Sequence, residues 1–268
     1  MGDIIYGRHP VLAALRRGES PLEEVLVARG LHGKWLEEVR HLSRAAGVRF
    51  RVTERVALDR VCGTPHHQGV AVRRSAFLYG SEKDLEAHLA AVPPPALLVA
   101  ADGLTDPMNL GNLARSALAA GAQGLIIPKD RAVGVTPAVA KAAAGALEYL
   151  KVFRVTNLAR VLAQLKDGGL TIIGTAADAA LSLYEADLTG PLVLVIGGED
   201  KGLRPLVRRQ CDLVVGIPMA TPEINSINAA AAGAVALFEV RRQREFGGGG
   251  QWGENAKREK GEKGKAEK

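Results

Sequence analysis

Apolar and polar residues alternate in blocks along the second half of the chain, in a pattern that predicts a parallel sheet. Six apolar runs of strand length are separated by stretches with helical spacing, such as residues 136–150 and 158–169. Because most of these runs are apolar at consecutive positions, not only at every second one, we expect helices to cover both faces of the sheet. The predicted fold class is therefore α/β. The runs span residues 96–103, 124–128, 151–155, 170–177, 192–198 and 213–218.

Residues 4–74 carry a second, smaller set of elements. They read in order as helix, strand, helix, strand and strand, which predicts a small α/β unit. The prolines of "AAVPPPALL" break any helix, so this segment is interpreted as a short stiff linker with the domain boundary near residue 92. We expect an N-terminal domain over 1–74, a linker over 75–95, a second domain over 96–244 and a tail over 245–268.

The composition narrows the class of protein. The sequence after Phe246 is rich in glycine and charge, which predicts a disordered basic tail. The apolar runs are shorter than the roughly 20 residues of a membrane span, and the N-terminus lacks the apolar core of a signal peptide. Cys62 and Cys211 lie far apart, without the spacing of a disulfide framework or a zinc site. We therefore expect a cytoplasmic protein with no membrane partner and no metal.

Positive charge gathers toward the two ends of the chain. Residues 1–74 hold 13 Lys and Arg against 8 Asp and Glu, a net charge of +5, whereas residues 96–240 hold 12 against 13, a net charge of −1. This difference suggests a module that holds a polyanion, joined to a module that performs chemistry. A basic surface that only contacts solvent would give the same counts, so charge alone leaves both interpretations open.

Polar residues follow three of the predicted strands. Asn109 and Arg115 come after the first apolar run, Glu199 after the fifth, and Ser226 and Asn228 after the sixth. Because open parallel sheets bind ligands at the carboxyl ends of their strands, we expect these three loops to converge. The second domain has no GxGxxG or GxxxxGK[ST] motif, and all six histidines lie between His9 and His88. Histidine-based catalysis and metal-dependent hydrolysis on this domain are therefore disfavoured.

Each of these polar residues also has a structural interpretation. Asn109 or Ser226 could cap the helix that follows it, Arg115 could be a solvent-exposed helix residue or a partner for Asp106, and Glu199 could be an ordinary turn residue. No single position decides between the two interpretations. The joint pattern carries more information than any one of its members.

Taken together, the segments resemble the three motifs of the SpoU/TrmH (SPOUT) family of RNA ribose 2′-O-methyltransferases. "NLGNLAR" resembles the first motif, N-x-G-x-x-x-R; "LVIGGEDKGL" resembles the glycine-acid second motif; and "IPMATPEINSINAAAAGAVALFE" resembles the third. The N-terminal "IIYGRHPVLAAL" and "PHHQGVAV" are similar to the RNA-binding domain of the subgroup that modifies a guanosine in bacterial 23S ribosomal RNA. The resemblance spans nearly the whole chain.

This resemblance implies S-adenosyl-L-methionine as the methyl donor and a trefoil knot from about Thr171 to Arg242, which general rules of sheet topology would not predict. The glycines of "GGEDKG" are then expected to let the backbone approach the cofactor closely. The expected cofactor contacts are Gly197, Ile217, Ile227, Thr175 and Met219. The expected catalytic residues are Arg115, Asn109, Glu199, Ser226 and Asn228.

The resemblance assigns Arg115 to the ribose 2′-hydroxyl. A guanidinium hardly ever gives up its proton, so we interpret Arg115 as a stabiliser of the developing alkoxide or an anchor for the adjacent phosphate. The general base stays unassigned.

The resemblance also implies a homodimer that pairs through the second domain, where the last helix, residues 228–238, offers small residues for close packing. RNA contacts are expected from Arg8, His9, His66, His67 and Gln68, although these residues could instead be caps and turns. Three other functions stay open at this point: a tRNA ribose methyltransferase, a non-catalytic RNA-binding protein, and a nucleotide-dependent oxidoreductase, which the missing glycine motif disfavours.

Overall fold

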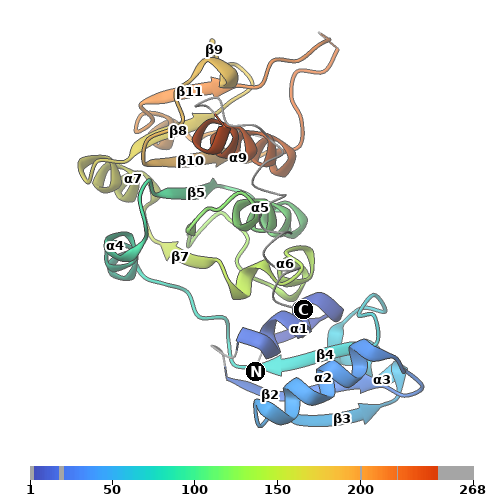
Figure 1. Ribbon diagram of the computed structural model, residues 1–268. Helices are drawn as coiled ribbons and strands as arrows, with labels where there is room; N and C mark the ends of the chain where they lie inside the picture. Colours follow the sequence, from blue (N-terminus) through green and yellow to red (C-terminus); the bar gives the residue numbers. More distant parts are fainter. Residues whose placement is uncertain (1–2, 18–20, 200, 222, 247–268) are drawn as a thin grey trace, which may run out of the picture.

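The computed structural model describes residues 3–17, 21–199, 201–221 and 223–246. Its strands form two sheets, each packed against helices (Figure 1). Within these residues the smaller sheet has four strands in the order β1-β4-β2-β3, and the larger has seven in the order β7-β6-β5-β10-β8-β11-β9. All neighbouring strands of the larger sheet run parallel, so the predicted α/β class is confirmed. Most of the predicted tail, residues 247–268, lies outside the described residues.

Helices cover both faces of the smaller sheet. Helices α1 and α2 pack on the face that buries Val25 and Val27, whereas α3 covers part of the other face with Leu58. The predicted order of elements omitted β1 and α3, because a four-residue strand is too short to show a pattern and α3 buries only one side chain. The elements are β1 (Asp3–Tyr6), α1 (Arg8–Arg17), β2 (Leu22–Ala28), α2 (Lys34–Ala45), β3 (Arg49–Thr53), α3 (Arg55–Cys62) and β4 (Val70–Arg74).

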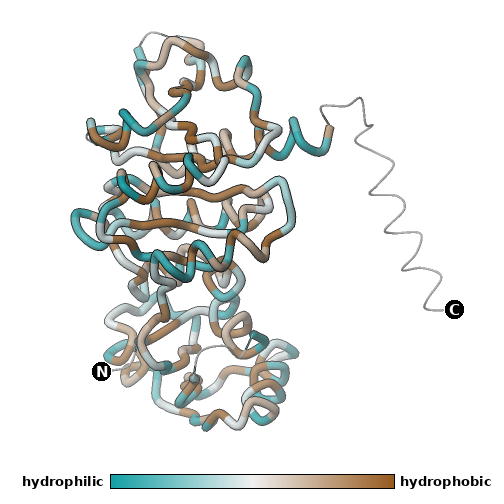
Figure 2. Tube along the Cα trace, turned by 90° about the vertical axis from the view of Figure 1, so that its left-hand side faces the viewer, coloured by the Kyte–Doolittle hydropathy of each residue, from teal (hydrophilic) through white to brown (hydrophobic). Residues whose placement is uncertain are grey.

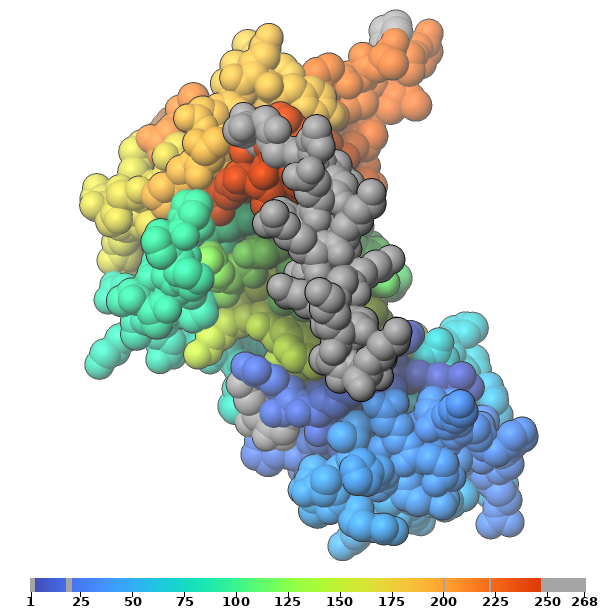
Figure 3. Space-filling view, in the orientation of Figure 1, coloured from blue at the N-terminus to red at the C-terminus, as the bar shows by residue number. Residues whose placement is uncertain are grey.

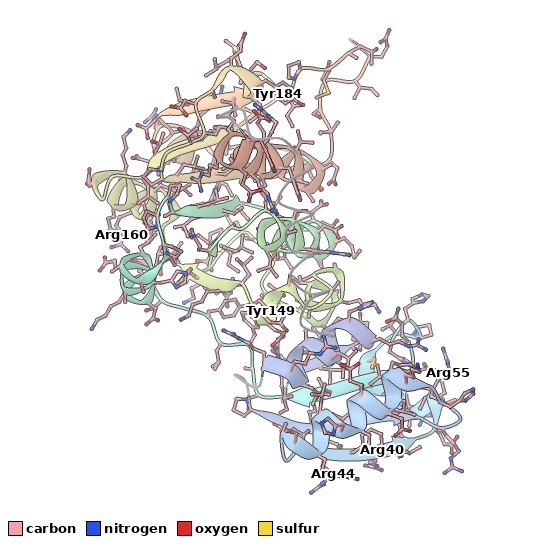
Figure 4. The ribbon with its side chains drawn as sticks, viewed as in Figure 1. Arg40, Arg44, Arg55, Tyr149, Arg160 and Tyr184 are labelled. Carbon is pink, nitrogen blue, oxygen red and sulfur yellow. The ribbon has the colours of Figure 1, made fainter. Side chains whose placement is uncertain are left out.

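The segment between the two sheets contains a helix, α4 (Glu82–Ala91), within the residues expected to form a linker. Ser81 and Asp84 form a capping box at its first turn, and Leu85 is buried among residues of the larger sheet. Glu82 of α4 pairs with Arg160 at 2.6 Å, and Figure 4 shows Arg160 on the side of the molecule where α4 lies. Helix α4 therefore packs against the larger sheet and belongs to the second domain.

The larger sheet is buried on both faces, as its continuous apolar strands predict. In β5, Leu97 and Val99 face a cluster with α5 and α9, whereas Leu98 and Ala100 face a cluster with α4 and α7. Figure 2 shows the hydrophobic stretches running along the strands of this sheet. The elements are β5 (Leu97–Asp102), α5 (Pro107–Ala119), β6 (Gly124–Pro128), α6 (Pro137–Ala142), η1 (Ala146–Glu148), β7 (Lys151–Val155), α7 (Leu158–Asp167), β8 (Thr171–Thr175), β9 (Leu181–Ser182), η2 (Leu183–Glu185), β10 (Leu192–Gly197), α8 (Pro205–Arg208), β11 (Leu213–Gly216) and α9 (Ala229–Phe246).

The strand order shows how the chain returns to the middle of the sheet. After β8 and the edge strand β9, the chain places β10 between β5 and β8, and α9 then packs against α5 and β10. This order places β10 beside β5, with β8 between β10 and β11, so the ends of all four strands lie along one edge of the sheet, where their loops can meet. The trefoil knot stays a prediction from the family resemblance.

The two parts of the chain are in direct contact. Arg74 of β4 pairs with Glu148 of η1 at 3.0 Å, and the two side chains are only 2% and 9% exposed. Gly145 approaches α1 so closely that a Cβ there would lie 2.7 Å from the Cβ of Ala13. Figure 3 shows the blue N-terminal part meeting the yellow-green part of the larger unit, and Figure 4 shows Tyr149 at this junction. The junction thus combines an ion pair with close packing.

Candidate active site

The loop after β10 folds back on itself and forms one wall of a cavity. Gly198 and Gly202 exchange two backbone hydrogen bonds, with N···O distances of 3.2 and 2.9 Å. A Cβ at Gly197 would lie 2.4 Å from the carbonyl carbon of Gly202, and one at Gly198 would lie 2.7 Å from the carbonyl oxygen of Gly103. The glycines are therefore required by the packing of the chain on itself, a reason different from the expected approach to a cofactor.

An ion pair fixes the end of the same loop. Asp102, the last residue of β5, is 1% exposed. Its carboxylate accepts a hydrogen bond from the backbone N–H of Arg204 at 2.7 Å and another from Arg204 Nε at 2.5 Å. Sequence reasoning missed this pair, although an aspartate that ends an otherwise apolar strand was a visible signal. The pair ties β5 to the start of α8.

A cavity of about 350 Å³ lies beside this loop, among the ends of β8, β10 and β11. Its walls include all five residues expected to contact a cofactor, together with Glu199 and Ser226 of the expected catalytic set. Those five are Thr175, Gly197, Ile217, Met219 and Ile227. The structure thus brings together residues that lie up to 52 positions apart in the sequence, from Thr175 to Ile227.

The chemistry of the cavity suits S-adenosylmethionine. Its volume falls in the usual range for small-molecule sites, and Leu183, Ile196 and Val215 give it apolar walls. Two acidic residues, Asp178 and Glu199, and two basic residues, Lys201 and Arg208, also line the cavity, and a mixed lining of this kind suits a ligand that carries charges of both signs. Arg208 donates hydrogen bonds to Asp178 at 2.9 and 3.2 Å, and these hydrogen bonds lower the pKa of that carboxyl. Asp178 therefore stays ionised near neutral pH.

Asn228 connects two other expected catalytic residues, Asn109 and Glu199. Its Nδ2 donates to Asn109 Oδ1 at 2.8 Å and lies 3.4 Å from Glu199 Oε1. Its Oδ1 accepts from the backbone N–H groups of Ala230 and Ala231 at 2.9 and 3.2 Å, so the same side chain caps α9. The first, second and third motifs therefore meet at one amide.

Arg115 lies apart from this group. It occupies the exposed face of α5 together with Met108 and Asn112, whereas Asn109 faces inward and is 4% exposed. Within the described part of the chain, Arg115 makes no hydrogen bond or ion pair, and it does not line the cavity. Among the described residues of a single copy, Arg115 thus makes no hydrogen bond or ion pair with the other expected catalytic residues.

The structure also tests the capping interpretations. Asp106 is the cap of α5, because its side chain accepts from the N–H of Met108 at 3.0 Å, so Asn109 does not have that role. Asp106 forms no ion pair with Arg115 among the described residues. The side chain that caps α9 belongs to Asn228, and Ser226 instead lines the cavity.

The residues expected to contact RNA separate into two groups. Arg8, His9 and His66 are exposed, and the Arg8 guanidinium lies 4.4 Å from the ring centroid of Trp35. His67 is fully buried: its Nδ1 accepts from the N–H of Gly69 at 2.9 Å, and Nε2 lies 2.6 Å from Asp59 Oδ1. Gln68 Oε1 accepts from the N–H of Arg8 at 2.9 Å, at the first turn of α1. His67 thus has the structural role that was the alternative to RNA contact, whereas Gln68 is exposed and stays a predicted RNA contact.

Neither a membrane helix nor a metal cluster is found among the residues that the structure describes. No helix there is both long and apolar enough to cross a bilayer. In the same residues, His, Cys, Asp and Glu side chains form no group of three or more that could hold a metal ion.

The chain belongs to the SpoU rRNA Methylase family, whose description matches residues 96–238. Residues 4–79 match a second description, RNA 2′-O ribose methyltransferase substrate binding. Among relatives, the 23S rRNA (guanosine-2′-O-)-methyltransferase RlmB of Shewanella oneidensis is 43% identical over 90% of this chain and 98% of its own length. The RlmB protein of Escherichia coli is 39% identical over 91% of this chain and 100% of its own length.

A solved structure extends the likeness to three dimensions. The SpoU methyltransferase AviRb from Streptomyces viridochromogenes, crystallised in complex with AdoMet, aligns with a TM-score of 0.75 and 29% identity. The alignment covers 90% of each chain.

Proposed function

We propose that this protein transfers a methyl group from S-adenosyl-L-methionine to the ribose 2′-hydroxyl of a guanosine in 23S ribosomal RNA. The observation that carries the proposal is the cavity at the ends of β8, β10 and β11, which collects the five expected cofactor residues. The names of the relatives at 39% to 43% identity support the ribosomal substrate. Ribosomal RNA as substrate supports a cytoplasmic site of action.

The chain's own residues supply positioning and electrostatics. S-adenosylmethionine, when bound, would supply an electrophilic methyl group. Glu199 would favour the positive charge of the donor, while the apolar walls would exclude water from it. Asn228 holds Asn109 and Glu199 in one hydrogen-bonded group, which would orient the ribose. The general base stays unassigned.

We further propose that the active protein is a homodimer that pairs through the exposed faces of α5 and α9. These two helices contact each other within one chain, and each exposes a large apolar side chain, Met108 at 52% and Phe238 at 48%. Arg115 lies on the same exposed face of α5 as Met108. Pairing there would place Arg115 of one chain near the cavity of the other, which would explain why Arg115 lies apart from its expected partners.

The smaller sheet is the proposed RNA-holding part. Arg8, His9, His66 and Gln68 remain its proposed contacts, and Figure 4 shows Arg40, Arg44 and Arg55 on the same domain. Phosphate contacts made by these side chains would make affinity fall steeply with salt.

The direct test is to incubate the purified protein with labelled S-adenosylmethionine and either ribosomal or transfer RNA, then map the ribose methyl groups. Methylation of one guanosine in 23S RNA is expected. A mark confined to transfer RNA would shift the substrate class, whereas a protein that fails to bind the cofactor in calorimetry would be a non-catalytic RNA-binding protein.

Mixing two inactive variants tests the placement of Arg115. Arg115→Ala should lower the rate a few hundredfold, equivalent to about 3–4 kcal/mol of transition-state stabilisation. If Arg115 acts across the dimer, mixing the Arg115→Ala variant with the Glu199→Gln variant should restore about a quarter of wild-type activity. Half of the dimers then contain one chain of each variant, and each such dimer has one complete site. No recovery after subunit exchange would place Arg115 in its own chain's site.

A further inference from the structure

A second, larger cavity adjoins the first and has no role in the chemistry described so far. It measures about 900 Å³ and lies at the carboxyl ends of β5, β6, β7 and β10. Gly198, Glu199, Lys201 and Gly202 line both cavities, so the loop after β10 is their shared wall. Whatever occupies the second cavity therefore lies next to the site proposed for the methyl donor.

The lining of this second cavity has the composition of a nucleobase site. Leu158, Pro205 and Leu206 give it apolar surface, and Leu206 keeps 65% of its side chain exposed. A base removed from a stack can be held against apolar side chains, which are aliphatic here, with polar groups at its edges. The polar groups here include Thr105, Thr156, Asp130, Arg131 and Lys201.

One of the carboxylates in this lining is free to bind a ligand. Both oxygens of Asp102 are bonded to Arg204, and Glu199 lies 3.4 Å from the Asn228 amide. Asp130 makes no hydrogen bond or ion pair with its side chain in the described part of the chain. Asp130 thus presents two acceptors to the cavity.

The loop that carries Asp130 is held at both ends. The N–H of Lys129 donates to the carbonyl of Val155 at 2.8 Å, and the N–H of Val133 donates to the carbonyl of Leu104 at 2.8 Å. Between these anchors, Arg131 has a left-handed backbone with φ of 59°. Non-glycine residues adopt this conformation at a cost, so the surrounding contacts fix the loop in one shape.

We propose that this second cavity holds the base of the methylated nucleotide, and that Asp130 recognises it as guanine. The inference rests on the proposed methyl transfer. The base is attached to C1′ of the ribose and the reacting hydroxyl to the neighbouring C2′, so the base must lie within one sugar ring of the methyl donor. Two cavities that share one wall allow this arrangement. The Watson–Crick edge of guanine offers two neighbouring donors, N1–H and the N2 amino group, which match the two oxygens of one carboxylate. Adenine offers only one donor on that edge.

The test compares Asp130→Asn with wild type on an RNA fragment that the wild type methylates, carrying either guanosine or inosine at the methylated position. Inosine lacks only the N2 amino group. With guanosine, Asp130→Asn should lower kcat/KM by about tenfold to a hundredfold, the usual effect of losing a bidentate base contact. The wild type should prefer guanosine over inosine, and the variant should lose that preference. Binding of S-adenosylmethionine should be unchanged, which also shows that the variant is folded.

Asp167→Asn is the matched control, because Asp167 ends α7, is exposed and does not line the cavity. It should behave as wild type. If Asp130→Asn keeps the wild-type kcat/KM or the wild-type preference for guanosine, Asp130 does not read the base. If it binds RNA more tightly, the cavity holds a phosphate instead, since removing a negative charge strengthens phosphate binding. Failure of the wild type to methylate any RNA would refute the proposed function, an outcome distinct from these.

Discussion

The buried ion pair between Arg74 and Glu148 sets how firmly the smaller sheet is held to the larger unit. Glu148→Leu would leave the Arg74 guanidinium, 2% exposed, without its carboxylate. Breaking one side of a buried pair costs about 3–5 kcal/mol because a charge is left uncompensated. Arg74 Nε already lacks a hydrogen-bond partner in the described structure, so little remains there to compensate. Against a typical total stability of about 5–15 kcal/mol, the loss would be large.

Urea unfolding followed by circular dichroism measures this loss. Glu148→Leu should lower the free energy of unfolding by about 3–5 kcal/mol, and combining it with Arg74→Met should recover most of that loss because the Arg74 charge is then removed as well. Glu37→Gln is the control, since Glu37 lies 3.9 Å from Arg40 and both side chains are exposed, so its loss should cost less than about 1 kcal/mol. Equal midpoints for Glu148→Leu and the control would refute the reasoning.

Four further predictions follow from the site and the charge distribution. Gly197→Ala should weaken S-adenosylmethionine binding at least tenfold in calorimetry, because the new Cβ would lie 2.4 Å from backbone atoms of Gly202. Gly190→Ala, whose Cβ would have no atom within 4 Å, should bind the cofactor normally. Equal affinities of the two variants would contradict this reasoning. Asn228→Ser should keep the cap of α9 and hence the melting temperature, but lose methyl transfer because serine is too short to reach Asn109; an active variant would argue against the bridge. Burial raises the pKa of the Cys211 thiol from 9.0 to about 11, so the contribution of the buried thiol to stability is present below pH 9.0 and is lost as the pH rises toward 11. Alkylation of Cys211 in the folded protein should accelerate over that pH range. Fast alkylation near neutral pH would contradict the raised pKa. Removal of residues 1–76, a cut that keeps α4, should weaken RNA binding and flatten its salt dependence while S-adenosylmethionine still binds; an unchanged salt slope would place the RNA contacts elsewhere.

The larger sheet could be predicted from the sequence because its strands are buried on both faces and so appear as unbroken apolar runs. The smaller elements could not, since β9 has two residues and α3 buries only Leu58. Helix α4 is a different case. Its capping signal, Ser81 followed three residues later by Asp84, is visible in the sequence. The prolines that follow, however, favour the interpretation of this segment as a linker.

The gathering of the five expected cofactor contacts around one cavity was predictable, because strand ends in a parallel sheet meet at one edge, whatever their separation along the chain. The burial of His67 could not be predicted, because the hydrogen bonds that satisfy its ring, to Asp59 and to the N–H of Gly69, form only in the folded chain. The separation of Arg115 from Asn109 was predictable in principle. Residues six apart on a helix do not share a face, since neighbours on one face are three or four apart.

Asn228 shows why the structural and catalytic interpretations of such residues need not compete. Its amide has an acceptor end and a donor end, and the structure uses both: Oδ1 caps α9, while Nδ2 bonds Asn109 and approaches Glu199. The cap fixes the rotamer of the side chain, and the fixed rotamer aims the donor at the first motif. A residue type that favours helix N-termini is therefore also suited to hold a site together where a helix begins at the edge of a sheet. The position of α9 on the sheet then determines the geometry of the whole group.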